Sequence, residues 1–114
     1  MNTYFYVGNG ERGKLGISVF VFQEIAEETV KSLAVKGELK DYMVFDPEKK
    51  IGKVKASIDK GQVTVDVQIV GIKGADLQNC STRLQKEIYE NIYDITEISN
   101  LKVNVSILSI VDHR

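Results

Sequence analysis

The feature that most constrains this chain is a strict alternation of apolar and polar residues on both sides of the turn Asp59-Lys60-Gly61. A period of two places successive side chains on opposite faces of a strand, and a glycine between two such runs is typical of a β-hairpin. The apolar positions are Val54, Ala56, Ile58, Val63, Val65, Val67 and Ile69. One face of this hairpin is therefore expected to be buried and the other to be polar.

A long helix and a further strand are expected after the hairpin. Asp76 is a residue type that caps helix N-termini, and the apolar residues after it recur at helical spacing within one narrow arc. This stripe consists of Leu77, Cys80, Leu84, Ile88, Ile92 and Ile95. Alternation returns from Leu101 to Ile107, which predicts a strand that pairs with an arm of the hairpin. The unit from Val54 to Ile107 thus specifies a hairpin, a helix and a strand.

The N-terminal half contributes one more helix. Ser18 can cap it, Gly37 can end it, and the helical spacing of apolar residues predicts that it runs from about Val19 to Val35. Before it, Tyr4-Phe5-Tyr6-Val7 is strand-like and Gly8-Asn9-Gly10-Glu11-Arg12-Gly13 is rich in glycine, so residues 1–12 are interpreted as a flexible lead-in. Residues 36–52 contain the only proline and are interpreted as a mobile surface connection.

Together these elements predict an α+β fold in the order β(short)-α-β-β-α-β. Two one-sided helices can bury their stripes against the apolar face of a mostly antiparallel sheet, giving a two-layer sandwich with both helices on one face. At 114 residues the chain is long enough for one core, so we expect a single domain over residues 13–114. The opposite face of the sheet would then be polar.

Composition narrows the expected cellular location of the chain and the classes of partner that it could bind. One cysteine cannot form an internal disulfide, and no early segment has the basic and apolar pattern of an export signal, so a cytoplasmic location is expected. No run of about 18 apolar residues occurs, which predicts no direct membrane span. The net charge of −1 gives no long-range attraction to polyanions, and no nucleic acid is expected as a partner.

The residue types that could act in catalysis, cofactor binding or metal binding do not occur in any combination typical of such a site. Residues 8–13 match the spacing of a dinucleotide-binding loop, but the helix starts too late and the topology does not fit a doubly wound sheet. Cys80 lies on the apolar stripe, which favours a buried structural thiol. The only histidine, His113, has no other imidazole or thiol nearby with which to bind a metal. Glu87 and Glu90 indicate a solvated helix face, so neither an enzyme nor a cofactor or metal site is predicted.

Four residues are candidates for protein interaction. Tyr89 and Tyr93 flank the apolar stripe and could anchor a partner, or could cover the edge of the core with their hydroxyls in water. Asp66 and Asn104 are expected on the polar face of the sheet. Tyr4-Phe5-Tyr6 poses a similar choice between a sheet-edge strand and an apolar tail that binds something.

The order of several short segments resembles the alkaline shock protein family of envelope stress response proteins in Gram-positive bacteria. The resemblance covers about residues 13 to 111 and depends on spacing, because no single motif is diagnostic. The positions that carry it are Gly13-Lys14-Leu15-Gly16-Ile17-Ser18, Ile25-Ala26, Val63-Thr64-Val65-Asp66-Val67, Gly74, Thr96 and Val103-Asn104-Val105. Lys73, Gln78 and Glu97 depart from the family pattern, so the chain resembles a divergent member.

The resemblance implies a small cytoplasmic protein without enzymatic activity. Such a protein would act near the inner membrane face, as a homo-oligomer or by docking on membrane-anchored protein partners. The leading functional prediction is thus a non-catalytic interaction or scaffold module. The alternative is a small module that binds single-stranded RNA on its open sheet face, although the strands expected there offer no aromatic residue for base stacking.

Overall fold

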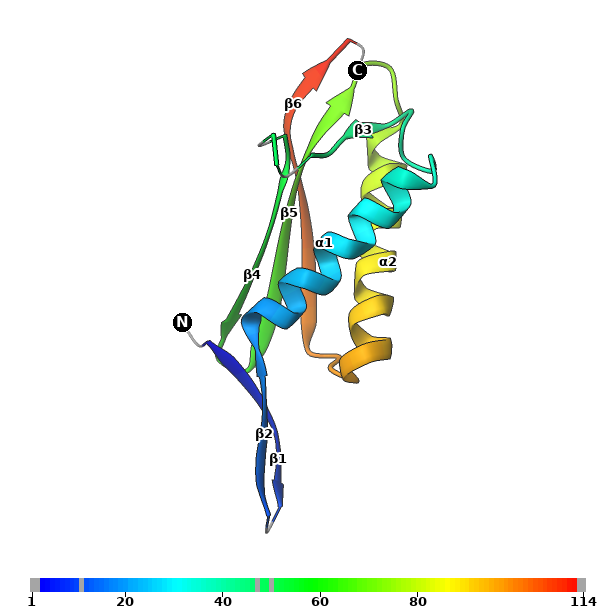
Figure 1. Cartoon of the computed structure of the whole chain (residues 1–114). Helices are drawn as coiled ribbons and strands as arrows, with labels where there is room; N and C mark the ends of the chain where they lie inside the picture. Colours follow the sequence, from blue (N-terminus) through cyan, green and yellow to red (C-terminus); the bar gives the residue numbers. More distant parts are fainter. Residues whose placement is uncertain (1–2, 11, 47, 50, 113–114) are drawn as a thin grey trace.

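The computed structural model describes residues 3–10, 12–46, 48–49 and 51–112. It contains two helices and six strands within these ranges (Figure 1). In chain order they are β1 (Tyr4–Gly10), β2 (Gly13–Ser18), α1 (Val19–Val35), β3 (Met43–Val44), β4 (Lys53–Asp59), β5 (Gln62–Ile72), α2 (Leu77–Thr96) and β6 (Leu101–Val111). His113 lies outside the described residues.

The main sheet is built around β5. The predicted hairpin is confirmed, since β4 pairs antiparallel with β5 from Lys53 opposite Gln68 to Asp59 opposite Gln62. The short strand β3 pairs antiparallel with the far end of β5, and β6 pairs with β5 in the parallel sense. Parallel pairing follows from the connection, because α2 returns the chain to the end of the sheet at which β5 began.

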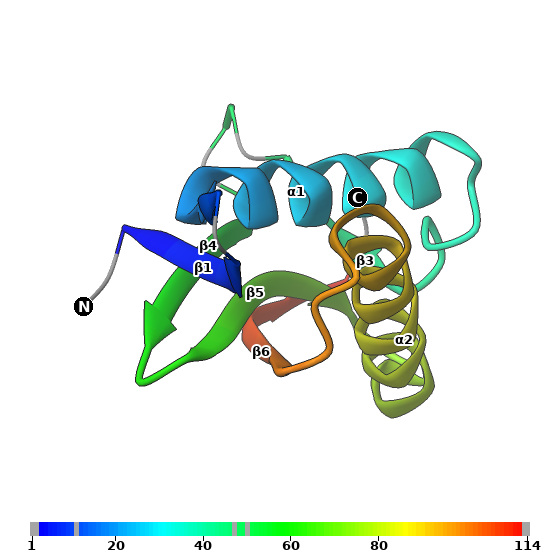
Figure 2. The same ribbon diagram turned by 90° about the horizontal axis from the view of Figure 1, so that it is seen from below.

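Both helices cover one face of this sheet, as the view from below shows (Figure 2). The α+β two-layer fold expected from the sequence is therefore confirmed. Helix α1 begins at Ser18, whose hydroxyl accepts a hydrogen bond from Phe20 N at 3.2 Å, and α2 begins at Asp76, whose carboxylate accepts one from Asn79 N at 3.0 Å. The fully buried side chains are those at the centres of the helical stripes and on the inner face of the sheet. They include Phe22, Val30, Ile58, Val63, Val65, Val67, Ile69, Leu84, Ile88 and Ile92.

Side chains from the helices also cover the outer edges of the sheet. Gln23 of α1 accepts a hydrogen bond from Ala56 N of β4 at 3.2 Å, and Gln85 of α2 donates one to Val103 O of β6 at 3.1 Å. Free edge groups invite pairing with other chains, so these two glutamines limit that pairing where the helices lie over the sheet.

The N-terminal residues differ from the flexible lead-in that the sequence predicts. Strand β1 pairs antiparallel with β2, from Tyr4 opposite Ser18 to Gly10 opposite Gly13, and forms a ribbon that we call the arm. The glycines do not break the strand, because they are accommodated by an irregular register between Val7 and Gly10. The apolar side chains of Phe5, Val7 and Ile17 pack against the core and fix the base of the arm.

The arm gives the molecule an elongated shape (Figure 1). The described chain spans 56 Å by 23 Å by 22 Å, with a radius of gyration of 15.3 Å. A compact domain of this length has a radius of gyration of about 13 Å. The remaining elements, from α1 to β6, form a two-layer unit that we call the body.

The connection over residues 36–52 has more structure than its sequence suggested. Leu39 and Met43 are buried in the core, and Met43 lies opposite Gly71 in the β3–β5 pairing. Asp46 and Ile51 also form an isolated antiparallel bridge. These contacts are made by single apolar residues that follow no periodic pattern. From the sequence alone, such a segment cannot be distinguished from a surface loop.

Candidate functional site

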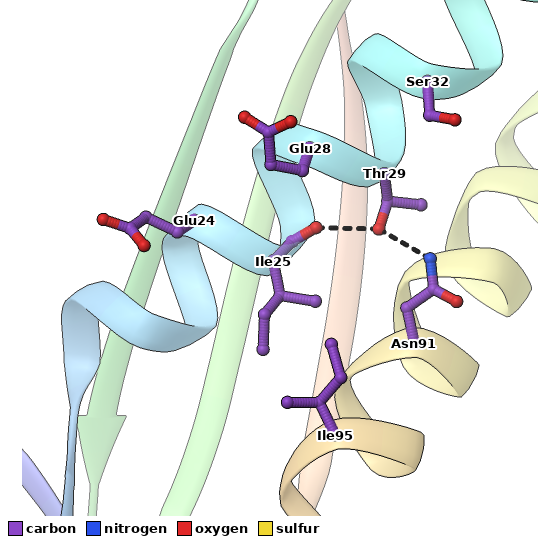
Figure 3. A pocket seen from close by; sticks show the side chains of 7 residues that line it. All are labelled: Glu24, Ile25, Glu28, Thr29, Ser32, Asn91 and Ile95. Carbon is purple, nitrogen blue, oxygen red and sulfur yellow. Dashed lines mark hydrogen bonds between the residues drawn. The ribbon is translucent and has the colours of Figure 1, made fainter.

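A groove opens to solvent between the middle turns of α1 and the C-terminal half of α2. It has a volume of about 310 Å³, and Figure 3 shows the seven side chains that line it, which are Glu24, Ile25, Glu28, Thr29, Ser32, Asn91 and Ile95. Five of these side chains come from consecutive turns of α1 and two from α2. We call this feature the helix groove.

The floor of the helix groove is held by a fixed pair of polar side chains. The Thr29 hydroxyl, which is buried, donates a hydrogen bond to Ile25 O at 2.7 Å and accepts one from Asn91 Nδ2 at 2.9 Å (Figure 3). Because the Thr29 proton is committed to Ile25 O, its oxygen must act as the acceptor toward Asn91. This bond ties α1 to α2 and fixes the orientation of the Asn91 amide, whose carbonyl oxygen remains an acceptor.

The rim of the helix groove is acidic, and one side of it is apolar. Glu24 and Glu28 lie on its α1 side, and Ile95 on its α2 side is 67% exposed. Among the described residues, the ion pairs are Arg83 with Glu38 and Lys73 with Asp112, so no cation of the same chain neutralises either rim carboxylate there. The groove therefore offers hydrogen-bond acceptors and apolar surface, which suits a basic group on an apolar stem.

Ile95 differs from its predicted position in the core. It belongs to the apolar stripe of α2 by its spacing, but in the structure it lines the open helix groove between α1 and α2, where 67% of its surface stays exposed. The periodicity of a helix defines which face is apolar and does not define how far along its length that face is covered. The stripe therefore ends on an uncovered isoleucine in the helix groove.

A second exposed surface lies on the arm. Tyr4 and Tyr6 occupy one face of β1, with ring centroids 6.1 Å apart, and Tyr6 is 61% exposed. Gly16 lies beneath them on β2, where an added Cβ would come within 3.0 Å of the Tyr6 ring. The missing side chain thus lets both rings lie across the ribbon. We call Tyr4, Tyr6 and Gly16 the tyrosine platform.

The polar face of the sheet is present as predicted. Asp66 and Asn104 lie directly opposite each other on β5 and β6, and Asn104 Nδ2 donates a hydrogen bond to Asp66 Oδ1 at 3.0 Å. Lys55 lies opposite Asp66 on β4, so the three strands form one polar row. Both predicted residues are exposed, and they satisfy each other across the sheet.

The two candidate tyrosines of α2 take different positions. Tyr89 packs against the core, and its hydroxyl donates a hydrogen bond to Ser99 O at 3.1 Å, which holds the connection between α2 and β6. Tyr93 is 45% exposed. Because the Asp66–Asn104 pair lies on the opposite layer, the structure does not bring the four predicted residues together in one site.

Cys80 is buried in the core as predicted, and its thiol is free. Burial raises the pKa of the thiol above its ordinary value of 9.0, and the nearby Arg83 guanidinium opposes this rise in part. A thiol in this setting keeps its proton at neutral pH and is a poor nucleophile.

Sequence reasoning identified neither the helix groove nor the tyrosine platform. Glu24 and Glu28 belong to no motif in the sequence, and Gly16 entered only as one position of the family resemblance. Within the described ranges, no group of three or more His, Cys, Asp or Glu side chains is arranged to hold a metal ion. Neither described helix combines the length and apolar character needed to span a membrane.

Comparisons with family models, with curated proteins and with solved structures gave no match to this chain.

Proposed function

We propose that this chain is a non-catalytic protein-interaction module that binds protein partners, including further copies of itself, through its exposed apolar surfaces. The observation that carries this proposal is the position of the exposed large apolar side chains. Tyr4, Tyr6 and Leu15 lie on the arm, Phe20 and Val21 at its base, and Ile107, Leu108 and Ile110 on the outer part of β6. Figure 1 places the arm and the outer part of β6 at opposite ends of the molecule.

Grouped apolar exposure distinguishes an interaction surface from the scattered exposure found on most proteins. An isolated two-stranded ribbon is only marginally stable in water, so the outer part of the arm would gain order from a partner. Tyrosine is also enriched at interfaces, because it buries a large ring while its hydroxyl stays hydrated. These points favour the arm as the principal contact surface.

A location near the inner face of the membrane is part of the proposal and follows from the resemblance to alkaline shock proteins. The chain would act there through a membrane-anchored partner. Flotation with vesicles of phosphatidylglycerol and phosphatidylcholine should leave the pure protein at the bottom of the gradient. Direct flotation of the pure protein would contradict a partner-mediated location.

The test of the proposed function is affinity capture with two baits, the full chain and its Tyr4→Ser/Tyr6→Ser variant, from a Gram-positive lysate that retains the membrane fraction. The wild-type bait should retain proteins, or untagged copies of the chain, that the variant loses. Equal retention by both baits, combined with strictly monomeric behaviour in light scattering, would contradict the proposal. Circular dichroism of both baits checks that the variant remains folded.

Binding of single-stranded RNA is the second candidate function. It is favoured by Lys53, Lys55 and Lys102, which are exposed on the open face of the sheet. The described part of that face presents no aromatic side chain on which a base could stack, so binding would depend on phosphate contacts alone. Filter binding should then show salt-sensitive retention that Lys55→Ala and Lys102→Ala weaken. The absence of retention at low salt would remove this function.

A further inference from the structure

We infer that the helix groove is the docking site for the tyrosine platform of a second copy of this chain, so that two copies exchange their arms. This inference rests on the proposed function and names one partner and one interface for it. Each half of the contact is an exposed surface described above, and the two halves are complementary in charge and in apolar character.

The arm supplies a basic and aromatic surface. On β2, Lys14 lies two residues before Gly16 and so shares its face with the tyrosine platform. Lys14 is exposed and forms none of the ion pairs found among the described residues. The ribbon therefore presents two tyrosine rings and one exposed ammonium group on the same side.

The helix groove supplies the complementary surface. Glu24 and Glu28 offer carboxylates to an ammonium group, and the fixed Asn91 amide offers a carbonyl oxygen between the helices. Ile25 and the exposed Ile95 offer apolar surface to a tyrosine ring. A lysine next to a tyrosine thus matches the groove both in charge and in apolar surface.

The arm of the same chain cannot fill its own groove, because the ribbon projects away from the body (Figure 1). A second copy can fill it. The groove begins at Glu24, which is five residues into α1, so it lies roughly 8 Å along the helix axis from the base of the arm. Because the groove begins close to the base of the arm, two copies can insert their arms reciprocally about a two-fold axis, which closes the assembly as a dimer.

The test is a charge exchange followed by sedimentation velocity of the full chain over a range of concentrations. The wild-type chain should form a dimer. Lys14→Glu and Glu28→Lys should each raise the dimer dissociation constant about tenfold or more, because each places like charges in contact. The double variant Lys14→Glu/Glu28→Lys should recover most of the wild-type affinity, because the attraction is restored with reversed sign.

Lys102→Glu is the matched control, because it changes the charge by the same amount on the opposite face of the sheet. It should leave the dissociation constant unchanged. Circular dichroism confirms that each variant is folded, and Ile95→Ser, which removes apolar surface from the groove without changing charge, should also weaken the dimer.

The outcomes separate this inference from the proposed function. A wild-type dimer that is insensitive to Lys14→Glu, Glu28→Lys and Ile95→Ser would overturn arm exchange and leave the interaction function standing. A chain that stays monomeric up to high concentration would also overturn arm exchange, and the two-bait capture would then decide whether another protein is the partner. Recovery in the double variant is the result that supports the inference.

Discussion

The body buries its apolar side chains within one chain, whereas the arm leaves part of its apolar surface exposed. In the body, alternating strands and one-sided helices face each other, so Val65, Ile88 and their neighbours are completely buried. In the arm, only the face with Phe5, Val7 and Ile17 packs against the core, while Tyr4 and Tyr6 on the other face remain in water. The body is thus complete within one chain, whereas the arm leaves apolar surface for another molecule.

This difference predicts that stability and association are carried by separate parts of the chain. Substitutions in the body should lower the free energy of unfolding. Substitutions on the exposed face of the arm should alter contacts with partners and leave the fold intact.

The largest expected effect concerns a body residue compared with an arm residue. Ile88→Ala removes a fully buried side chain and should lower the free energy of unfolding by about 2–5 kcal/mol, because it loses apolar burial and leaves a cavity. Tyr6→Ala in the arm should change it by less than about 0.5 kcal/mol in dilute solution. Urea unfolding followed by circular dichroism measures both. Equal losses would show that the arm belongs to the cooperative core.

A second comparison uses two glycines with positive φ. Gly52 has φ +81°, and an added Cβ would lie 2.6 Å from Gln68 O and 2.7 Å from the Phe45 ring. Gly52→Ala should therefore cost more than about 2 kcal/mol, because backbone strain and overpacking combine. Gly13 in the arm has φ +108° but nothing within 4 Å of an added Cβ. Gly13→Ala should have a much smaller effect on global unfolding, and the reverse order in thermal unfolding would contradict the division into arm and body.

A third, smaller loss in the free energy of unfolding is expected for a substitution in the floor of the helix groove. Thr29→Val removes the acceptor of the Asn91 amide and leaves that donor unpaired, which should cost about 1–2 kcal/mol. Thr82→Val is the matched control, because Thr82 makes the same kind of bond to the carbonyl four residues earlier, Gln78 O, on an exposed surface. Chemical unfolding of both variants should show a clear loss for Thr29→Val and almost none for Thr82→Val. Equal losses of stability in the two variants would mean that the Thr29–Asn91 hydrogen bond between the helices adds nothing to the free energy of unfolding.

The smallest effect is a dependence of body stability on pH through Cys80. The raised pKa means that the folded thiol keeps its proton to a higher pH than the unfolded thiol. The stability that this buried protonated thiol gives the fold is therefore fully present below pH 9.0, the ordinary pKa. It is lost as the pH rises from 9.0 through the folded pKa, so the free energy of unfolding should fall over that pH range. Comparing Cys80→Ala with the wild-type chain isolates this component. Parallel pH profiles for the two proteins above pH 9 would contradict it.

The sequence predicts the body well because its signals are periodic. The alternation around Asp59-Lys60-Gly61 and the stripe from Cys80 to Ile92 each repeat over several turns or strand residues, and both are buried as expected, while Leu77 at the start of the stripe is half-buried. Caps at Ser18 and Asp76 placed the helix starts, because a side-chain acceptor at that position satisfies a free backbone amide.

The arm and the helix groove were not predictable in the same way. The glycines between Val7 and Gly13 indicate a loose loop when read locally, and only the pairing with β2 makes them part of a ribbon. The groove depends on where α1 and α2 cease to cover each other, which depends on their packing in three dimensions. No local pattern distinguishes the exposed Ile95 from the buried Ile92 one helical turn earlier.

Amide hydrogen exchange measured by mass spectrometry at low and high protein concentration tests the account most directly. We predict that peptides from β5 and α2 are strongly protected at both concentrations, while peptides from β1 and β2, together with the groove segment of α1, gain protection only at high concentration. Arm peptides as protected as β5 in dilute solution, or arm protection that does not change with concentration, would contradict the division between a self-sufficient body and an arm completed by a second molecule.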